Sequence, residues 1–251
     1  MEEFKDHFSQ QSKIYLRYRP QYPPELFEFL SSLVTAHNCA WDCATGNGQA
    51  ALGLTPYFES IIATDASKEQ ISNAIPHKKI SYAVCPADRT SIPSQSIDII
   101  TVAQAIHWLN FTSFYAEVSR VLQPAGIIAA WGYGWTQISP DVDIIVKEFV
   151  QTIVGPYWPP ERKYVDEKYS KLPFPFEEIQ SPVFSMEALW NMEEFLGYLE
   201  TWSSSRRFFE ERQAQPTESI KSKLSEAWGH DPLSKRNICW PLFMRVGRTH
   251  S

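Results

Sequence analysis

The stretch from residue 39 to residue 133 alternates short apolar runs with longer amphipathic runs. This alternation is typical of a parallel β-sheet in which each strand is joined to the next by a crossover helix. Strands that are covered by helices on both faces are apolar along nearly their whole length. The sequence therefore predicts an α/β fold, with strands at residues 39–43, 60–64, 80–85, 97–103 and 126–131.

The chain changes character after residue 134. Proline-rich loops (GPYWPPERK and KLPFPFEE) separate aromatic-rich helical stretches such as DVDIIVKEFVQTIV and MEEFLGYLETW, which we interpret as a helical cap inserted in the C-terminal half. The tail NICWPLFMRVGRT predicts a terminal strand, and PVFSMEALW is its expected partner. Pro241 in this tail indicates a sheet edge or a bulge, because proline cannot donate a ladder hydrogen bond.

The composition narrows the range of partners. The chain carries 23 Lys and Arg against 29 Asp and Glu, a formal net charge of −6, so no overall basic surface attracts phosphate backbones or anionic lipid. No run approaches the ~20 apolar residues of a membrane span, and the N-terminus lacks the apolar core of a signal peptide. We expect a cytoplasmic protein that binds neither nucleic acid nor membrane, and the sequence leaves its oligomeric state open.

The four cysteines do not suggest a metal site. None forms a CxxC pair or a Cys/His cluster with the spacing of zinc ligands. We therefore expect reduced, buried thiols and no metal.

The segment AWDCATGNGQAALG carries the strongest local signal. An apolar strand ends in Asp42 and runs into Gly46 and Gly48 before a helix begins, and glycine lets the backbone pass close to a ligand. The following strand, IIATDAS, ends in Asp65, where a carboxylate can accept hydrogen bonds from both ribose hydroxyls of an adenosine. Together the two strand ends predict an adenosine-binding site.

The glycine loop by itself leaves other interpretations open. Gly46, Gly48 and Ala51 also satisfy the pattern of dinucleotide-binding proteins, so a nicotinamide-dependent oxidoreductase is one alternative. Asp42 weighs against it, because a carboxylate just before the glycines is electrostatically unfavourable beside a pyrophosphate and suits a cationic ligand better. A tight turn without any ligand is a further alternative, and Asp65 weighs against that one.

Five motifs resemble the class I S-adenosylmethionine-dependent methyltransferases, and specifically the trans-aconitate methyltransferase-like subgroup of the type-11 group. They are the loop DCATGNGQ, the ribose-binding TDAS, the adenine-edge segment CPADRTSIP, the strand IDIITVAQAIHW and the turn LQPAGIIAAW. Ala44 and Ala125 depart from the family pattern, because each replaces a glycine. The lead-in SQQSKIYLRYRPQYP and the downstream FLGYLETWSSSRRF are similar to segments of the same subgroup, so the resemblance covers nearly the whole chain.

The resemblance implies one methyltransferase domain with a Rossmann-like, mostly parallel, seven-stranded sheet and helices on both faces. Its expected parts are an N-terminal lid (1–36), a cofactor-binding core (37–133), a cap and substrate region (134–235) and the terminal strand (236–251). The implied cofactor is S-adenosyl-L-methionine. The implied cofactor-binding residues are Tyr15, Arg19, Asp42, Ala44, Gly46, Asp65, Ala87, Asp88, Gln104 and Ala105.

The acceptor pocket is expected at the carboxyl end of the fourth strand, where open parallel sheets bind ligands. His107 follows that strand directly. As a catalytic base it could deprotonate an acceptor, because imidazole titrates near neutrality; the alternative is a packed, hydrogen-bonded histidine. The candidate pocket residues are His107, Trp108, Trp131, Trp202 and Ser203.

Two arginine pairs are candidates for holding an acceptor carboxylate by bidentate hydrogen bonds, Arg17 with Arg19 and Arg206 with Arg207. Solvated surface positions are the alternative for them. The sequence thus predicts methyl transfer to a small-molecule acceptor, possible acceptors including carboxylic acids. The alternatives are an oxidoreductase and a non-catalytic binding module of the same fold.

Overall fold

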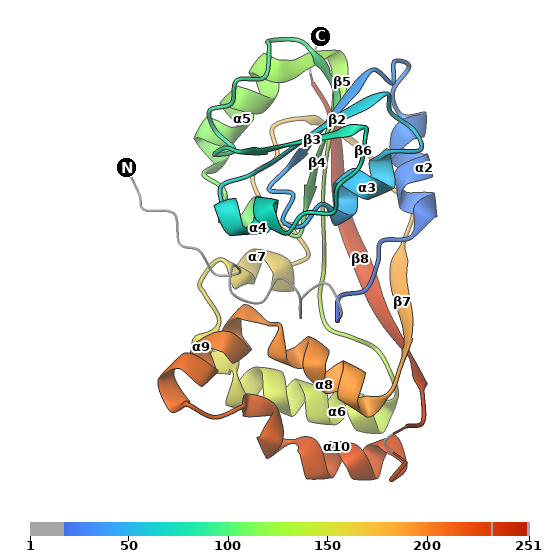
Figure 1. Ribbon diagram of the computed structural model, residues 1–251, viewed down its shortest axis with the longest axis vertical. Coiled ribbons are helices and arrows are strands. Elements are labelled where there is room, and N and C mark those ends of the chain that lie inside the picture. The colour runs from blue at the N-terminus through green and yellow to red at the C-terminus, as the bar shows by residue number, and fades with distance from the viewer. Residues whose placement is uncertain (1–17, 232, 250–251) are drawn as a thin grey trace.

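The computed structural model describes residues 18–231 and 233–249, and in this part of the chain the predicted α/β fold is confirmed. The sheet has the order β3-β2-β1-β4-β5-β8-β6, with β7 paired to β8 (Figure 1). It has eight strands, one more than predicted. The strands are β1 (Cys39–Cys43), β2 (Ser60–Asp65), β3 (Ile80–Val84), β4 (Ile97–Ala103), β5 (Leu122–Tyr133), β6 (Glu177–Ile179), β7 (Ser185–Trp190) and β8 (Arg236–Arg248).

The strands β1 to β5 are parallel and form the half of the sheet that was predicted from apolar runs. Their side chains alternate between two separate cores: Ile99 and Ile127 lie in one, and Ile100 and Ile128 in the other. A strand buried on both faces needs apolar residues at every position. This requirement explains why β4 reads as a continuous apolar run.

Helices cover both faces of the parallel strands (Figure 1). The helices α2 (Pro24–Ser32) and α3 (Gln49–Leu54) pack into one core, whereas α5 (Phe111–Val121) packs into the other. The short helix α4 (Lys68–Ser72) follows β2 and is capped by the Ser67 side chain, which accepts a hydrogen bond from the Gln70 backbone N–H.

The C-terminal half adds a second layer of helices below the sheet, with α7 between the two (Figure 1). Its elements are α6 (Pro140–Glu148), the π-helical η3 (Phe149–Ile153), η4 (Gly155–Tyr157), α7 (Arg162–Asp166), α8 (Met192–Glu200), α9 (Ser203–Arg212), η5 (Pro216–Ser219) and α10 (Lys221–Trp228). The segments predicted as helical at 141–154 and 192–202 lie in this layer.

The antiparallel strands β7 and β8, which α8 to α10 separate in the chain, connect the sheet with the helical layer. The first half of β8 pairs with β7, and from Leu242 onward β8 pairs antiparallel with β5. Pro241 lies at this change of partner, where a missing N–H disturbs neither ladder. The additional strand β6 pairs antiparallel with the last three residues of β8, from Val246 to Arg248.

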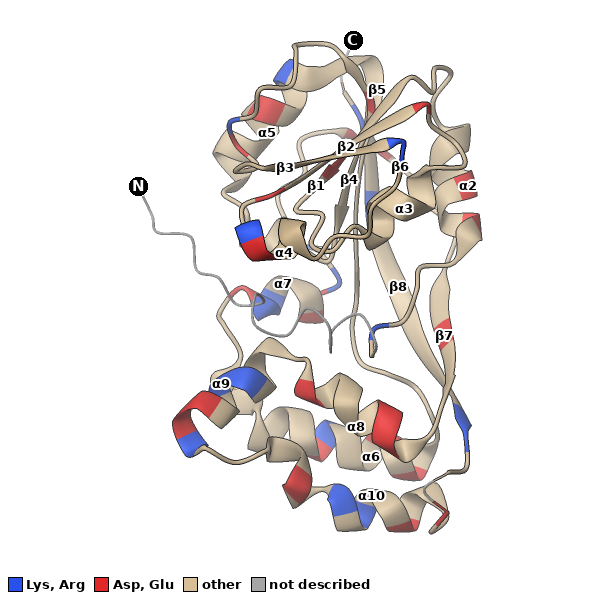
Figure 2. Ribbon diagram, in the orientation of Figure 1, with Lys and Arg blue, Asp and Glu red and all other residues tan. Residues whose placement is uncertain are grey.

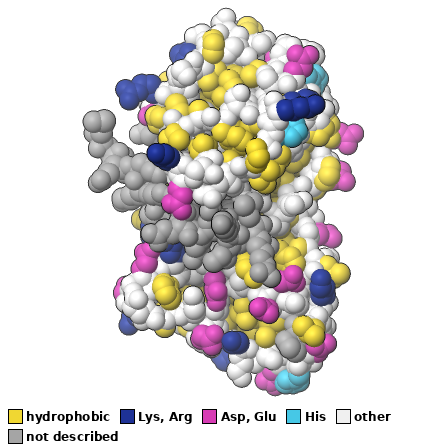
Figure 3. All heavy atoms as spheres, in the orientation of Figure 1, with side chains coloured by type: hydrophobic (Ala, Val, Ile, Leu, Met, Phe, Trp, Pro, Cys, Tyr) yellow, Lys and Arg dark blue, Asp and Glu magenta, His cyan; other side chains and the backbone are white. Residues whose placement is uncertain are grey.

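The surface of the described residues mixes both charges. Figure 2 shows Lys and Arg interspersed with Asp and Glu on α4, α9 and α10. In the same view, hydrophobic side chains gather over the half of the molecule that holds the parallel strands (Figure 3). Among the helices described here, none combines the length and hydrophobicity that a membrane crossing requires.

Candidate active site

Asp42, the last but one residue of β1, organises the loop that follows. Its buried carboxylate accepts hydrogen bonds from Thr45 Oγ1 at 2.5 Å, Thr101 Oγ1 at 2.7 Å and the Ala51 backbone N–H at 3.0 Å. Burial raises the pKa of this carboxyl to about 6, although the hydrogen bonds act in the opposite direction. Asp42 therefore joins β4 to both ends of the loop.

The loop itself runs through left-handed backbone conformations. The φ angles are 54° at Ala44, 57° at Gly46 and 90° at Gly48. A Cβ on Gly48 would lie 2.2 Å from Tyr82 Oη, so only glycine fits there. Ala44 occupies a position where the backbone itself favours glycine, which gives a physical reason for the glycine in the family pattern.

Asp65 lies beside this loop at the carboxyl end of β2. One carboxylate oxygen accepts a hydrogen bond from the Gly46 N–H at 2.9 Å and the other from the Ser67 N–H at 2.8 Å. The predicted loop and the predicted ribose-binding acid are thus in direct contact. They form a continuous edge across the ends of β1 and β2.

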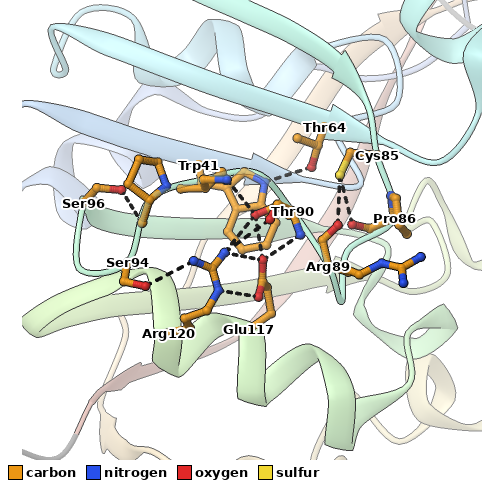
Figure 4. Close-up of polar contacts among 12 residues, drawn as sticks. Trp41, Thr64, Cys85, Pro86, Arg89, Thr90, Ser94, Ser96, Glu117 and Arg120 are labelled. Atoms are coloured by element: carbon orange, nitrogen blue, oxygen red, sulfur yellow. Dashed lines mark hydrogen bonds and ion pairs between the residues drawn. The ribbon is translucent and has the colours of Figure 1, made fainter.

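The segment after β3 that carries Ala87 and Asp88 is held by a half-buried ion pair between Glu117 and Arg120 (Figure 4). Glu117 of α5 accepts hydrogen bonds from Arg120 and from the backbone N–H and hydroxyl of Thr90. These bonds, led by the one from Arg120, lower the pKa of Glu117 to about 2. Asp88 is exposed and Ala87 half-buried, so both lie at the surface of the anchored segment.

Gln104 follows β4 in a left-handed conformation, with φ 53°. Its side-chain amide pairs with the Tyr133 backbone, accepting from the N–H at 2.9 Å and donating to the carbonyl at 3.2 Å. Arg19 donates to the Tyr133 hydroxyl at 2.5 Å and to the Thr201 carbonyl at 3.3 Å. Arg19 therefore links the end of β5 to the end of α8. Tyr15, predicted beside it, lies outside the described residues, as does Arg17.

Ala105 leads into the short helix η2 (Ile106–Trp108), which holds His107 and Trp108. His107 is buried, and its Nδ1 lies 2.9 Å from Tyr169 Oη. Burial, and secondarily the charge of Arg162, lower the pKa of His107 to about 3. The imidazole is therefore neutral at pH 7 and weakly basic.

The other predicted pocket residues separate into two groups. Trp131 is fully buried and packs edge-on against Tyr22 and Phe27, so it occupies a core position with no open wall. Trp202, with Ser203 after it, lies in the helical layer, where its ring is 5.9 Å from Trp135 and 5.7 Å from Trp158.

Arg162 is a candidate functional residue that the sequence reasoning did not find. Its guanidinium lies over the rings of Trp135 and Trp158, and its charge acts on His107. Arg206 pairs instead with Glu210, and Arg207 donates to the Tyr157 carbonyl.

Two features of the loop suit an adenosine cofactor. Among the described residues, a Cβ added at Gly46 would meet only Gln70 Oε1, 3.9 Å away, so the space before this backbone is open. The Nδ2 of Asn47 is buried without a hydrogen-bond partner in the described chain, and a ligand could accept from it. No three His, Cys, Asp or Glu side chains gather into a metal-binding group within residues 18–231 and 233–249.

A mostly parallel sheet of this order, with a glycine loop after β1 and an acid ending β2, is a Rossmann-like arrangement, in which ligands generally bind at the carboxyl ends of the strands. The sequence profile of the type 11 family, described as a methyltransferase domain, matches residues 41–130. A protein of Dictyostelium discoideum named as a methyltransferase is 34% identical over 229 residues, which cover 90% of this chain and 87% of that protein. The chain belongs to the methyltransferase family, and its cofactor is S-adenosylmethionine.

Solved structures agree with this membership. A protein from Anaeromyxobacter dehalogenans described as a type II methyltransferase is 40% identical, with a TM-score of 0.86 over 93% of this chain and all of that one. The Saccharomyces cerevisiae protein CRG1, named as an S-adenosylmethionine-dependent methyltransferase, is 32% identical over 132 residues, 49% of this chain and 45% of that protein. These similarities favour the methyltransferase interpretation over the oxidoreductase.

Proposed function

We propose that this enzyme transfers the methyl group of S-adenosylmethionine to a small carboxylic acid, as its resemblance to the trans-aconitate methyltransferase-like subgroup implies. The observation that carries this proposal is the state of His107. With its pKa lowered to about 3, this side chain is a poor general base at neutral pH. A carboxylate is nucleophilic without deprotonation, whereas an ammonium group or an alcohol needs a base.

The residues proposed to hold the cofactor lie along the carboxyl ends of β1 to β4. Gly46 and Ala44 would contact it through the backbone, Asp65 would accept from the ribose, and Asp88 from the adenine amino group. Gln104 and Ala105 would line the methionine half. The open space before Gly46 and the unsatisfied amide of Asn47 support this placement.

When bound, the cofactor supplies a methyl group already activated by the sulfonium. A carboxylate acceptor would take this methyl group without losing a proton, so no residue of the chain would have to act as a base. The protein's task is to align the acceptor and exclude water. We propose that residues 18–36 and 134–231 enclose the acceptor over the core, with Trp108 and Trp202 among the residues facing it.

The test is a pH profile of methyl transfer from labelled cofactor to a panel of small carboxylic acids. With S-adenosylmethionine saturating, we expect kcat/KM for the acceptor to be constant between pH 7 and 8, because the pKa of His107 is lowered to about 3 and lies far below that range. The matched alcohols and amines should not react. Turnover restricted to amines or phenols, with a rate that rises with pH, would contradict the proposal.

A further inference from the structure

Arg162, the first residue of α7, lies over the rings of two tryptophans. Its guanidinium carbon lies 4.1 Å from the ring centroid of Trp135 and 4.5 Å from that of Trp158. Trp202 completes a triangle, with its ring 5.9 and 5.7 Å from the other two. The three tryptophans come from the loop after β5, the loop after η4 and the start of α9. We call Arg162 and these three rings the arginine frame.

The guanidinium in this frame has unused hydrogen-bonding capacity. Arg162 Nε donates a hydrogen bond to Asp166 at 3.0 Å. This bond leaves the two terminal nitrogens, Nη1 and Nη2, for other acceptors. Its Nη2 is buried and has no hydrogen-bond partner among the described residues. An unsatisfied buried donor costs folding free energy, so Nη2 is available to an acceptor from beyond the described residues.

The arginine frame adjoins the reacting end of the sheet. The helix α7 packs against η2, which directly follows β4. The charge of Arg162 lowers the pKa of His107 in η2 and counteracts the raised pKa of Tyr198 in α8, so it lies close to both elements. Trp135 keeps 38% of its surface exposed, which leaves one side of the frame accessible from solvent.

The other described candidates for an anion-binding arginine are engaged with the protein itself. Arg19 donates to Tyr133 and Thr201, and Arg206 pairs with Glu210. Arg207 donates to the Tyr157 carbonyl. Of these four arginines, Arg162 is the one whose guanidinium lies over two tryptophan rings, whereas that of Arg19 lies 5.3 Å from the centroid of the Tyr198 ring.

We infer that Arg162, in its tryptophan frame, binds a carboxylate group of the methyl acceptor other than the one that is methylated. This inference rests on the proposed function. A guanidinium bound to the reacting carboxylate would neutralise it and weaken its nucleophilicity, whereas binding a second carboxylate orients the acceptor without that loss. The planar fork of the guanidinium suits bidentate recognition of a carboxylate.

The experiment measures acceptor binding separately from cofactor binding. Protein saturated with S-adenosylhomocysteine is titrated with succinate, glutarate and citrate, with the corresponding neutral amides, and with inorganic phosphate, following the thermal unfolding temperature. The variants are Arg162→Gln and Arg162→Lys, and Lys171→Gln is the matched control, since its side chain is 74% exposed and pairs only with nearby Glu167.

We expect at least one of these acids to stabilise the wild-type complex and the amides to have no effect. Arg162→Gln should weaken the binding of that acid by about 30-fold or more, which is the usual effect of breaking a desolvated charge pair. Arg162→Lys should also weaken the binding, because an ammonium group is not planar and cannot form the bidentate hydrogen bonds of a guanidinium. Lys171→Gln should bind like the wild type, and S-adenosylhomocysteine should bind all four proteins with the same Kd.

Three results would overturn the inference: no response to any of the acids, equal affinity in Arg162→Gln, or phosphate as effective as the acids. If S-adenosylhomocysteine binds and a dicarboxylic acid is methylated equally by wild type and Arg162→Gln, the proposed function stands and this inference fails. If S-adenosylhomocysteine does not bind the wild type, the proposed function fails and the inference with it.

Discussion

Replacing Ala125 by glycine should stabilise the protein, because Ala125 adopts a left-handed conformation with φ 63° near the start of β5. A residue with a Cβ pays about 1–2 kcal/mol for that conformation. Glycine lowers the free energy of unfolding by about 0.4–1 kcal/mol, because it increases the conformational freedom of the unfolded chain. The Ala125 side chain is exposed, so little packing is lost, and the net gain should be about 0.5–1 kcal/mol.

Urea unfolding followed by circular dichroism measures this gain, and a thermal scan should show a rise of about 1–3 °C. Ala116→Gly is the matched control, because Ala116 is exposed within α5 and glycine costs about 1 kcal/mol in a helix interior. The two substitutions remove the same methyl group and should act with opposite sign. Equal destabilisation by both would refute the argument that the turn at Ala125 is strained.

Three further predictions concern the carboxylates of the site. Glu117→Gln should destabilise the protein by about 1.5–3 kcal/mol, the value of a charged hydrogen bond. Because the pKa of Glu117 is lowered to about 2, the difference in unfolding free energy from the wild type should be complete above about pH 4.5 and shrink as pH falls toward 2. Asp42 has a pKa raised to about 6, so calorimetric affinity for the cationic cofactor should improve as pH rises through 6, and Asp42→Asn should flatten this dependence. Asp65→Ala should abolish cofactor binding in the same assay while costing about 1 kcal/mol of stability per lost hydrogen bond to Gly46 and Ser67; unchanged affinity would remove Asp65 from the site.

The parallel half of the fold was predictable because its information is local. Each strand of β1 to β5 is a short apolar run, and right-handed crossovers between parallel strands leave few possible orders. The same reasoning located the loop between Asp42 and Gly48 and the acid Asp65, since carboxyl ends of neighbouring parallel strands share one edge. The contact between Asp65 and the Gly46 N–H is the direct outcome.

The eighth strand was not predictable from its own residues. The three residues of β6, Glu177–Ile179, form no apolar run, and they pair only because the end of β8 offers them an unpaired edge. A strand whose existence depends on a distant partner leaves no periodic pattern in its own sequence.

The sequence by itself determined the sheet, the glycine loop and the class of cofactor, because these depend on contiguous segments and on residue type. Only the tertiary structure decided the arginine frame, where Trp135, Trp158 and Trp202 come from separate segments around Arg162. It also decided the state of His107, since a side chain that ordinarily titrates near neutrality is kept neutral by burial and by the charge of Arg162. Both outcomes depend on desolvation and on charges distant in sequence, and these are properties of packing.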